Sequence, residues 1–177
     1  MRKCVLLCLI LSIMLLSASC ARTDATPAQV LDALTKAEIG LPAGQVYLAS
    51  APEDDAAYLS PDLMAALYGQ GELPWQLSLI EDYGLFLSTA QHPCEFAVFR
   101  TYARSDTDEV AAMCHARLDA LRVHYKDAQA ATQSAAQYAE PYAHYVRDAR
   151  VVVIGKYVLL IVSSDTDHAL RTAQGVI

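Results

Sequence analysis

Residues 151–162 read VVVIGKYVLLIV, and this stretch decides the fold class. Two apolar runs, 151–154 and 157–162, flank the pair Gly155-Lys156. Glycine at the first central position favours a two-residue type II′ turn, because that turn requires a positive φ there. Strands that are apolar on both faces are typical of the middle of a covered sheet. The stretch therefore predicts a β-hairpin at the centre of a sheet with helices on its faces.

A second hairpin is predicted upstream of this one. Every second position from Leu77 to Leu87 is apolar except Glu81, a pattern typical of a strand and clearest over residues 83–89. A second strand is predicted at residues 95–102 after a short loop, and its two faces are formed by Phe96, Val98, Arg100 and Tyr102 and by Ala97, Phe99 and Thr101. Because so few residues join the two segments, we expect them to pair as antiparallel neighbours. A brief strand is also expected at residues 46–49.

Three short helices are predicted from their capping residues. Residues 26–27 read Thr-Pro and residues 60–61 read Ser-Pro, the order of an N-cap followed by proline in the first helical turn. The first of these helices is expected to end before Gly40 and the second at Gly69. Asp165 is expected to cap the last helix of the chain.

The longest helix is predicted to begin after Asp106. Apolar or small residues recur beyond it at steps of three or four, so that one stripe faces a core: Val110, Cys114, Leu118, Leu121, Tyr125, Ala128 and Thr132. Together these elements predict an α+β fold. We expect a mainly antiparallel sheet of about four strands, backed by one long helix and flanked by small helices.

The N-terminal 19 residues have the features of an export signal. Arg2 and Lys3 precede an apolar run at residues 5–16, which is shorter than the roughly 20 residues needed to span a bilayer. Residues 16–20 then read LSASC. This segment resembles the lipobox of bacterial lipoproteins, in which small residues precede a cysteine that becomes the lipidated first residue. The resemblance implies that Cys20 is lipidated.

Two other interpretations of this segment are ordinary signal cleavage after Ala21 and an uncleaved membrane anchor. If Cys20 carries lipid, its two or three acyl chains are enough for stable anchoring, at about 0.8 kcal/mol per buried CH₂. The chain is then divided into a signal peptide (1–19), a tether (20–27) and one domain (28–177). We expect this domain on the extracytoplasmic face of the bacterial cell membrane.

Charge and length restrict the classes of partner. The chain has 13 basic and 20 acidic residues, a net charge of −7. Loss of Arg2 and Lys3 with the signal peptide would leave 11 basic residues against 20 acidic ones, a net charge of −9. Nucleic acid is not expected as a partner, because phosphate binding requires a basic face. The 158 residues that follow Ser19 suit a single domain.

The region from about residue 82 to residue 167 carries a family resemblance. Its features are EFAVF at residues 95–99, Tyr138 followed three residues later by Pro141, and GKYVLLIVS at residues 155–163. This region resembles the bacterial lipoprotein family catalogued as domain of unknown function 4358, whose members also begin with a lipobox. The resemblance implies an envelope lipoprotein, and it supplies no activity or catalytic residue.

One group of residues invites a thiol or metal interpretation, namely His92, Cys94, Cys114 and His115. Outside the cytoplasm two thiols suggest a disulfide, and two Cys with two His suggest zinc. The expected geometry opposes both. The strand carries the chain about 26 Å away from Cys94, and the helix returns only about 12 Å before Cys114. We therefore expect Cys114 to be a small buried hydrophobic residue and Cys94 a thiol at the end of a loop.

Other polar groups are weaker candidates. Ser163, Asp165 and His168 resemble parts of a hydrolase triad, but no Gly-x-Ser-x-Gly turn presents a nucleophile. Glu95 is either a partly buried carboxylate or, as we expect, an edge charge that prevents strand pairing. The ten tyrosines and Trp75 either line a surface that binds glycan or peptide, or pack the core, which we favour.

The sequence thus predicts a lipid-anchored binding or scaffolding module rather than an enzyme, with no cofactor and no metal. Its partners are expected to be the membrane, through Cys20, and an envelope protein or glycan. The alternative is an extracytoplasmic enzyme, hydrolytic or thiol-based. A converging set of polar side chains in a pocket would favour this alternative, and an exposed aromatic surface would favour the binding module.

Overall fold

The computed structural model describes residues 24–89, 92–131 and 142–177, so Cys20 and the signal segment lie outside the described residues. Five strands form one sheet in the order β1-β2-β3-β5-β4, and all neighbouring pairs are antiparallel. Their bounds are β1 Gly44–Leu48, β2 Ile80–Ser88, β3 Glu95–Thr101, β4 Arg150–Ile154 and β5 Tyr157–Val162. The predicted α+β class with a mainly antiparallel sheet is confirmed.

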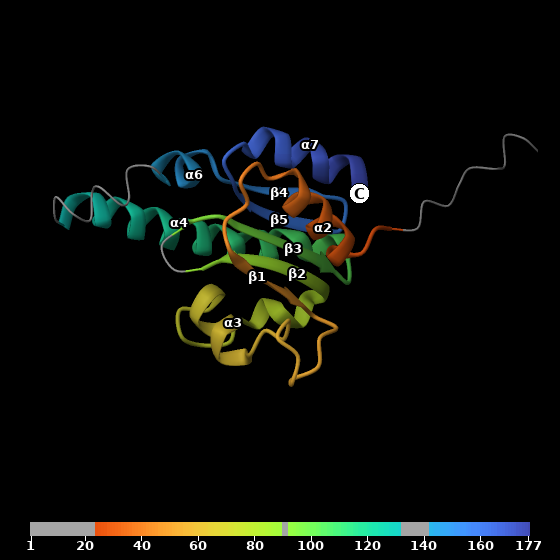
Figure 1. Ribbon diagram of the computed structural model, residues 1–177. Coiled ribbons are helices and arrows are strands. Elements are labelled where there is room, and N and C mark those ends of the chain that lie inside the picture. Colours follow the sequence, from red (N-terminus) through yellow and green to blue (C-terminus); the bar gives the residue numbers. More distant parts are fainter. Residues whose placement is uncertain (1–23, 90–91, 132–141) are drawn as a thin grey trace, which may run out of the picture.

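Helices cover both faces of this sheet (Figure 1). Helices α2 (Pro27–Ala37) and α7 (Thr166–Val176) pack together on one face. The long helix α4 (Thr107–Ala131) crosses the other face, next to α3 (Pro61–Tyr68) and the 3₁₀-helix η1 (Trp75–Leu79). Two short elements, η2 (Arg104–Asp106) and α6 (Ala143–Asp148), lie at opposite ends of α4.

The centre of the core is formed by β3 and β5. Every residue of β5 is buried, and in β3 only Arg100 is not. Phe96 and Val98 of β3 point toward α2 and α7, while Ala97 and Phe99 point toward α4, because successive side chains of a strand alternate between the two faces. Each face of the central strands therefore contacts its own helical layer.

The predicted capping residues act as expected. The Thr26 hydroxyl accepts the Gln29 N–H at 3.2 Å, and the Gln29 side chain accepts the Thr26 N–H at 2.9 Å, which completes a capping box for α2. Ser60 caps α3 at Leu63, and Asp165 caps α7 through the N–H of His168 at 2.9 Å. Local side-chain chemistry therefore sets these three helix starts.

Two details of the predicted sheet are corrected. The C-terminal hairpin does not lie wholly at the centre, because β4 is an edge strand on which Val153 is 42% exposed. The predicted alternation from Leu77 begins too early, since Trp75–Leu79 is a 3₁₀-helix and the strand starts at Ile80. The apolar residues of η1 contact α4, so their burial is tertiary rather than a property of a strand.

The β4–β5 turn gives a first testable prediction. Gly155 has a φ of 61°, whereas the φ of Lys156 is not positive. Ile154 pairs with Tyr157 across these two residues, so the turn has the features of type II′. We expect Gly155→Ala to lower the free energy of unfolding by about 1–2 kcal/mol, because an L side chain is strained at this φ although no atom blocks its Cβ. Urea unfolding measures this change.

The matched control is Gly175→Ala in α7, where an added Cβ also meets open space but φ is not positive. This substitution should leave stability unchanged or raise it by up to about 1 kcal/mol, because alanine favours a helix. Equal losses in the two variants would contradict the turn assignment.

Candidate functional site: a cleft at one end of the sheet

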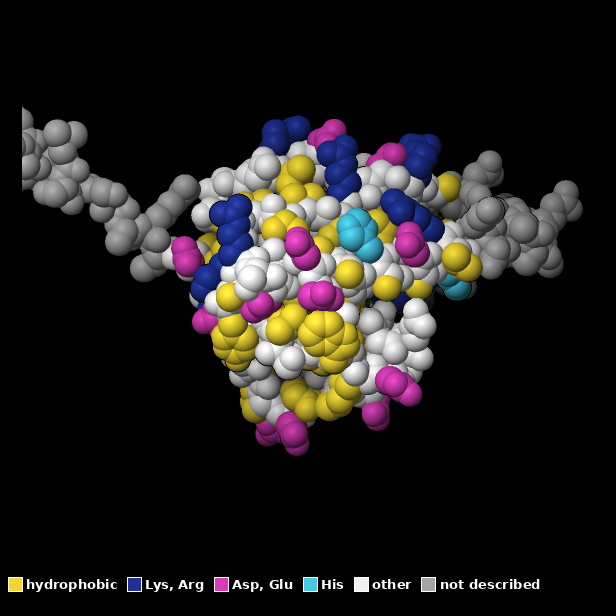
Figure 2. Space-filling view, turned by 180° about the vertical axis from the view of Figure 1, so that it is seen from behind, with side chains coloured by type: hydrophobic (Ala, Val, Ile, Leu, Met, Phe, Trp, Pro, Cys, Tyr) yellow, Lys and Arg dark blue, Asp and Glu magenta, His cyan; other side chains and the backbone are white. Residues whose placement is uncertain are grey.

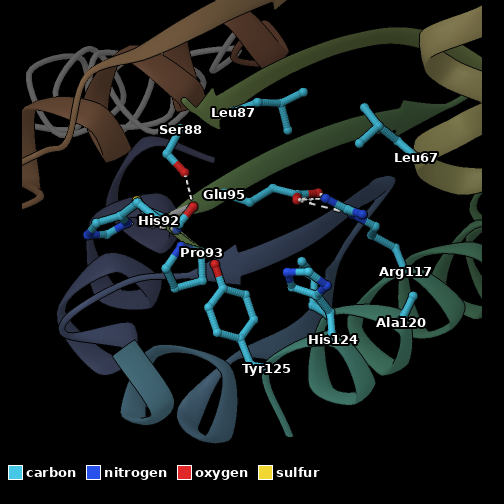
Figure 3. Close-up of a pocket in the computed structure, with 12 residues that line it drawn as sticks. Leu67, Leu87, Ser88, His92, Pro93, Glu95, Arg117, Ala120, His124 and Tyr125 are labelled. Carbon is cyan, nitrogen blue, oxygen red and sulfur yellow. Dashed lines mark hydrogen bonds and ion pairs between the residues drawn. The ribbon is translucent and has the colours of Figure 1, made fainter. Parts of the chain in front are cut away.

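A cleft of about 380 Å³ lies where β2 ends and β3 begins, bordered by α3 and α4 (Figure 3). Ligand-binding clefts commonly have a volume of this order. Polar side chains from three elements point toward it, and apolar side chains complete its walls. Its lining residues are Leu67, Leu87, Ser88, His92, Pro93, Cys94, Glu95, Arg117, Ala120, Leu121, His124 and Tyr125.

An ion pair between Glu95 and Arg117 lies on one side of the cleft (Figure 3). Arg117 Nη2 donates to Glu95 Oε2 at 2.7 Å, and Nε donates to the same oxygen at 3.1 Å. The hydroxyl of Tyr68, at the end of α3, donates to Glu95 Oε1 at 2.8 Å. The Glu95 side chain is only 3% exposed, so this is a buried, hydrogen-bonded salt bridge.

The fold brings these three residues together from distant parts of the chain. Glu95 is the first residue of β3, and its side chain lies on the face that α4 covers. Arg117 lies one turn after Cys114, at the margin of the buried stripe of α4, and so it reaches across to the strand. Burial, reinforced by Glu95, raises the pKa of Tyr68. Burial opposes the charge on Arg117, but Glu95 outweighs it and raises the pKa of Arg117.

His92 belongs to a second wall of the cleft. Its Nδ1 accepts the Cys94 N–H at 3.1 Å, and its carbonyl accepts the Ser88 hydroxyl. The ring packs against Tyr142 and Tyr145, with centroids 4.4 and 4.9 Å away. Burial lowers the pKa of His92, partly opposed by Glu38. Through these contacts His92 supports the start of β3.

The opening of the cleft is formed by the outer residues of α4. His124 is exposed and stacks edge-on against Tyr125 at 5.3 Å. Burial, followed by the proximity of Tyr142, raises the pKa of Tyr125 to about 12. The phenol is therefore neutral at ordinary pH. The opening thus combines an aromatic ring and an imidazole with the apolar wall of Leu87 and Leu121.

Cys94 and Cys114 are free and buried in the structure. Cys94 immediately precedes Glu95, so its side chain lies toward the other face of the sheet, where Glu38 is a neighbour. Cys114 lies on α4. The sheet thus separates the two thiols, which is a different reason from the axial offset inferred from sequence. Burial raises the pKa of both thiols well above the ordinary value.

This burial predicts that both thiols react slowly. We expect iodoacetamide to alkylate Cys94 and Cys114 at least about tenfold more slowly in the folded protein than in urea, because the reactive species is the thiolate and both thiols lack solvent access. Peptide mass spectrometry of timed samples measures the two rates. A Val123→Cys variant is the control, since position 123 is exposed and should react rapidly. Rapid native alkylation at Cys94 or Cys114 would contradict the described burial.

The remaining predicted candidates are not brought together. His115 is exposed on α4, away from the cleft that contains His92 and Cys94. Within residues 24–89, 92–131 and 142–177, no three His, Cys, Asp or Glu side chains form a group that could hold a metal ion. Ser163 is buried and Asp165 is occupied as a helix cap, so neither forms a triad with His168.

The prediction that Glu95 is an edge charge is wrong. Its strand, β3, is the central strand of the sheet, and the carboxylate is buried against Arg117. The alternative interpretation, a buried carboxylate, is the correct one. Sequence reasoning missed Arg117 and Tyr68 as its partners. The available signal was a lone arginine at the margin of an apolar helical stripe, together with a lone glutamate at the start of an apolar strand.

The aromatic residues divide between core and surface. Tyr68, Tyr145 and Tyr157 are buried, as we favoured, whereas Trp75 is 59% and Tyr102 is 60% exposed. Figure 2 shows hydrophobic side chains gathered on the lower part of one face, below a band of mixed acidic and basic side chains. Tyr138 lies outside the described residues.

Comparison of the chain with protein-family models, with curated proteins and with solved structures finds no match.

Proposed function

We propose that the protein is a lipid-anchored binding or scaffolding module on the extracytoplasmic face of the bacterial cell membrane. The signal-like N-terminus and the LSASC segment that ends at Cys20 support the anchor. In the described part of the chain, no helix is long and apolar enough to cross a membrane. In this proposal the cleft beside Glu95 and Arg117 receives a segment of an envelope protein or a glycan.

The observation that supports a binding role is that polar groups in the cleft are hydrogen-bonded to other groups of the protein. Glu95 accepts hydrogen bonds from Arg117 and Tyr68, and the Ser88 hydroxyl donates to the His92 carbonyl. A nucleophile needs an adjacent base to activate it, and a general acid or base must reach the substrate. These side chains instead bond one another, which is typical of a rigid recognition surface.

The thiol-based alternative has little support from this arrangement. Catalytic cysteines are partly exposed and have a lowered pKa. Cys94 and Cys114 are buried and have a raised pKa. A convergent polar pocket would favour a hydrolase, and polar groups do converge here, but Glu95 is held by Arg117 and Tyr68, and Nδ1 of His92 accepts the Cys94 N–H. Binding therefore accounts for the cleft better than catalysis does.

The anchor is tested by intact-mass measurement of the protein extracted from membranes. We expect a chain that begins at Cys20 and carries added acyl mass, and a Cys20→Ala variant that is released from the membrane fraction. A mature chain that begins after Ala21, or that has no added mass, would overturn the anchor.

The cleft is tested by photocrosslinking in intact cells. A photoreactive amino acid at Ala120, which lines the cleft, should capture a discrete polypeptide or glycan. The matched control carries the same group at Val153, which is exposed on the edge strand β4. Capture by both positions alike, or by neither, would overturn the proposed binding role of the cleft.

A further inference from the structure

The start of the described chain and the cleft lie at opposite ends of the sheet. The described chain starts at Asp24, and Ala25 is already buried. The Tyr157 hydroxyl donates to the Ala25 carbonyl, so the start of the described chain is fixed to the first residue of β5. Tyr157 pairs with Arg100, near the end of β3. The chain therefore enters the fold at the end of the sheet that contains the β4–β5 turn, Tyr102 and η2. We call this the entry end of the domain, and the opposite end, which contains the cleft, the cleft end.

The cleft lies at the opposite end. Glu95 pairs with Val162, five residues along each strand from the Arg100–Tyr157 pair. Five strand residues span about 17 Å. In Figure 1 the red start of the described chain and the Ser88 end of β2 lie on opposite sides of the domain. Helix α4 runs from the entry end toward the cleft end, and its Val123 lies about 24 Å from Thr107 along the helix axis.

The proposed anchor at Cys20 is close to the entry end. Four peptide units separate Cys20 from Asp24, and they reach at most about 14 Å even when fully extended. A lipid on Cys20 would therefore hold the entry end of the domain near the bilayer surface. This reach is shorter than the roughly 17 Å that separate the two ends of the β3–β5 ladder, so the cleft end lies farther from the anchor than the entry end does.

The surface of the entry end suits a lipid interface. Tyr102 is 60% exposed there, and tyrosine is enriched where membranes meet water. Lys156 Nζ donates to the backbone carbonyl of Tyr102 at 2.9 Å, which places a cation at the same end of the sheet. Asp24 and Asp106 lie at the same end, so the contact is not predicted to require anionic lipid.

We infer that the end formed by Ala25, Tyr102 and the β4–β5 turn rests on the lipid surface, and that the cleft opens away from it. This inference rests on the proposed lipid anchor and deepens the proposed function. The cleft then faces a ligand outside the bilayer.

The test uses tryptophan emission as a report of position. Trp75 is the only tryptophan in the chain, so Trp75→Phe provides a background without this signal. Into it are placed Tyr102→Trp at the entry end or Val123→Trp at the cleft end, both at exposed positions. The full-length acylated proteins are extracted from membranes and reconstituted in phosphatidylcholine vesicles with and without brominated acyl chains.

We expect brominated lipid to quench the emission of Tyr102→Trp and to leave that of Val123→Trp unchanged. Equal quenching of both, stronger quenching of Val123→Trp, or quenching of neither would overturn the orientation. Acyl mass on Cys20 is measured in the same samples. Its absence would overturn the anchor itself, whereas its presence without the expected quenching would overturn only the orientation.

Discussion

Arg117→Met is expected to lower the free energy of unfolding by about 3–5 kcal/mol. The substitution removes the charged partner of Glu95 and leaves a carboxylate that is 3% exposed with only the Tyr68 hydroxyl as a donor. An unpaired charge is costly in such a place, because the protein interior does not replace the water that solvated it in the unfolded chain. Urea unfolding of the two proteins at neutral pH measures the difference.

The same substitution elsewhere on α4 is the matched control. Arg122 also forms an ion pair, with Asp119 at 3.2 Å, but both side chains are largely exposed. Arg122→Met should therefore change stability by no more than about 0.5 kcal/mol. If the two substitutions cost the same, the salt bridge of Arg117 would not be the buried interaction described here.

A combined variant distinguishes the destabilisation caused by an unpaired buried charge from the stability that the intact ion pair contributes. Tyr68→Phe, Glu95→Leu and Arg117→Met together replace the whole polar group with apolar side chains of similar size. We expect this triple variant to be more stable than Arg117→Met alone, because no buried charge is left unpaired. A triple variant that is less stable than Arg117→Met would show that the unpaired carboxylate is not the source of the loss, and a triple variant that is less stable than the unaltered protein would show that the intact polar group stabilises the fold.

Phe99→Ala is expected to lower the free energy of unfolding by about 3–5 kcal/mol. Phe99 is fully buried at the centre of β3. Its ring packs edge-on against Tyr68, with centroids 5.4 Å apart, and is tilted against Tyr83 at 6.3 Å. Its removal exchanges apolar burial and two aromatic contacts for a cavity that the neighbouring strands cannot close. Thermal and urea unfolding should both show the loss.

Tyr102→Ala is the control for Phe99→Ala, because it removes an aromatic ring from the chain just after the same strand. The ring is exposed, and the bonds at this position run through the backbone N–H and carbonyl. We expect a change of no more than about 0.5 kcal/mol. A large loss from Tyr102→Ala would indicate that its ring packs against the domain.

Much of the fold was predictable because its signals are local. Thr26, Ser60 and Asp165 each cap a helix within three residues of themselves, and Gly155 sets a two-residue turn. The buried stripe of α4 from Val110 to Leu121 follows from helical periodicity alone. These elements depend on interactions between near neighbours, which the order of residues specifies directly.

The candidate site was less predictable because its contacts are distant in sequence. Glu95 lies 27 residues from Tyr68 and 22 residues from Arg117. Whether a glutamate at the start of a strand is exposed or buried depends on whether that strand is at the edge or the centre of the sheet. Strand order is not a local property, and for this reason Glu95 was assigned to the wrong environment.

The sequence by itself determined the helix caps, the two hairpins, the α+β class and the signal-like segment that ends at Cys20, because each of these depends on residues within one turn or one hairpin. The tertiary structure alone decided that β3 is central and β4 is an edge. It also placed Arg117 against Glu95, and the cleft at the end of the sheet opposite to Ala25. These outcomes arise from packing two helical layers onto one sheet, which brings together charges and cavities that no local pattern specifies.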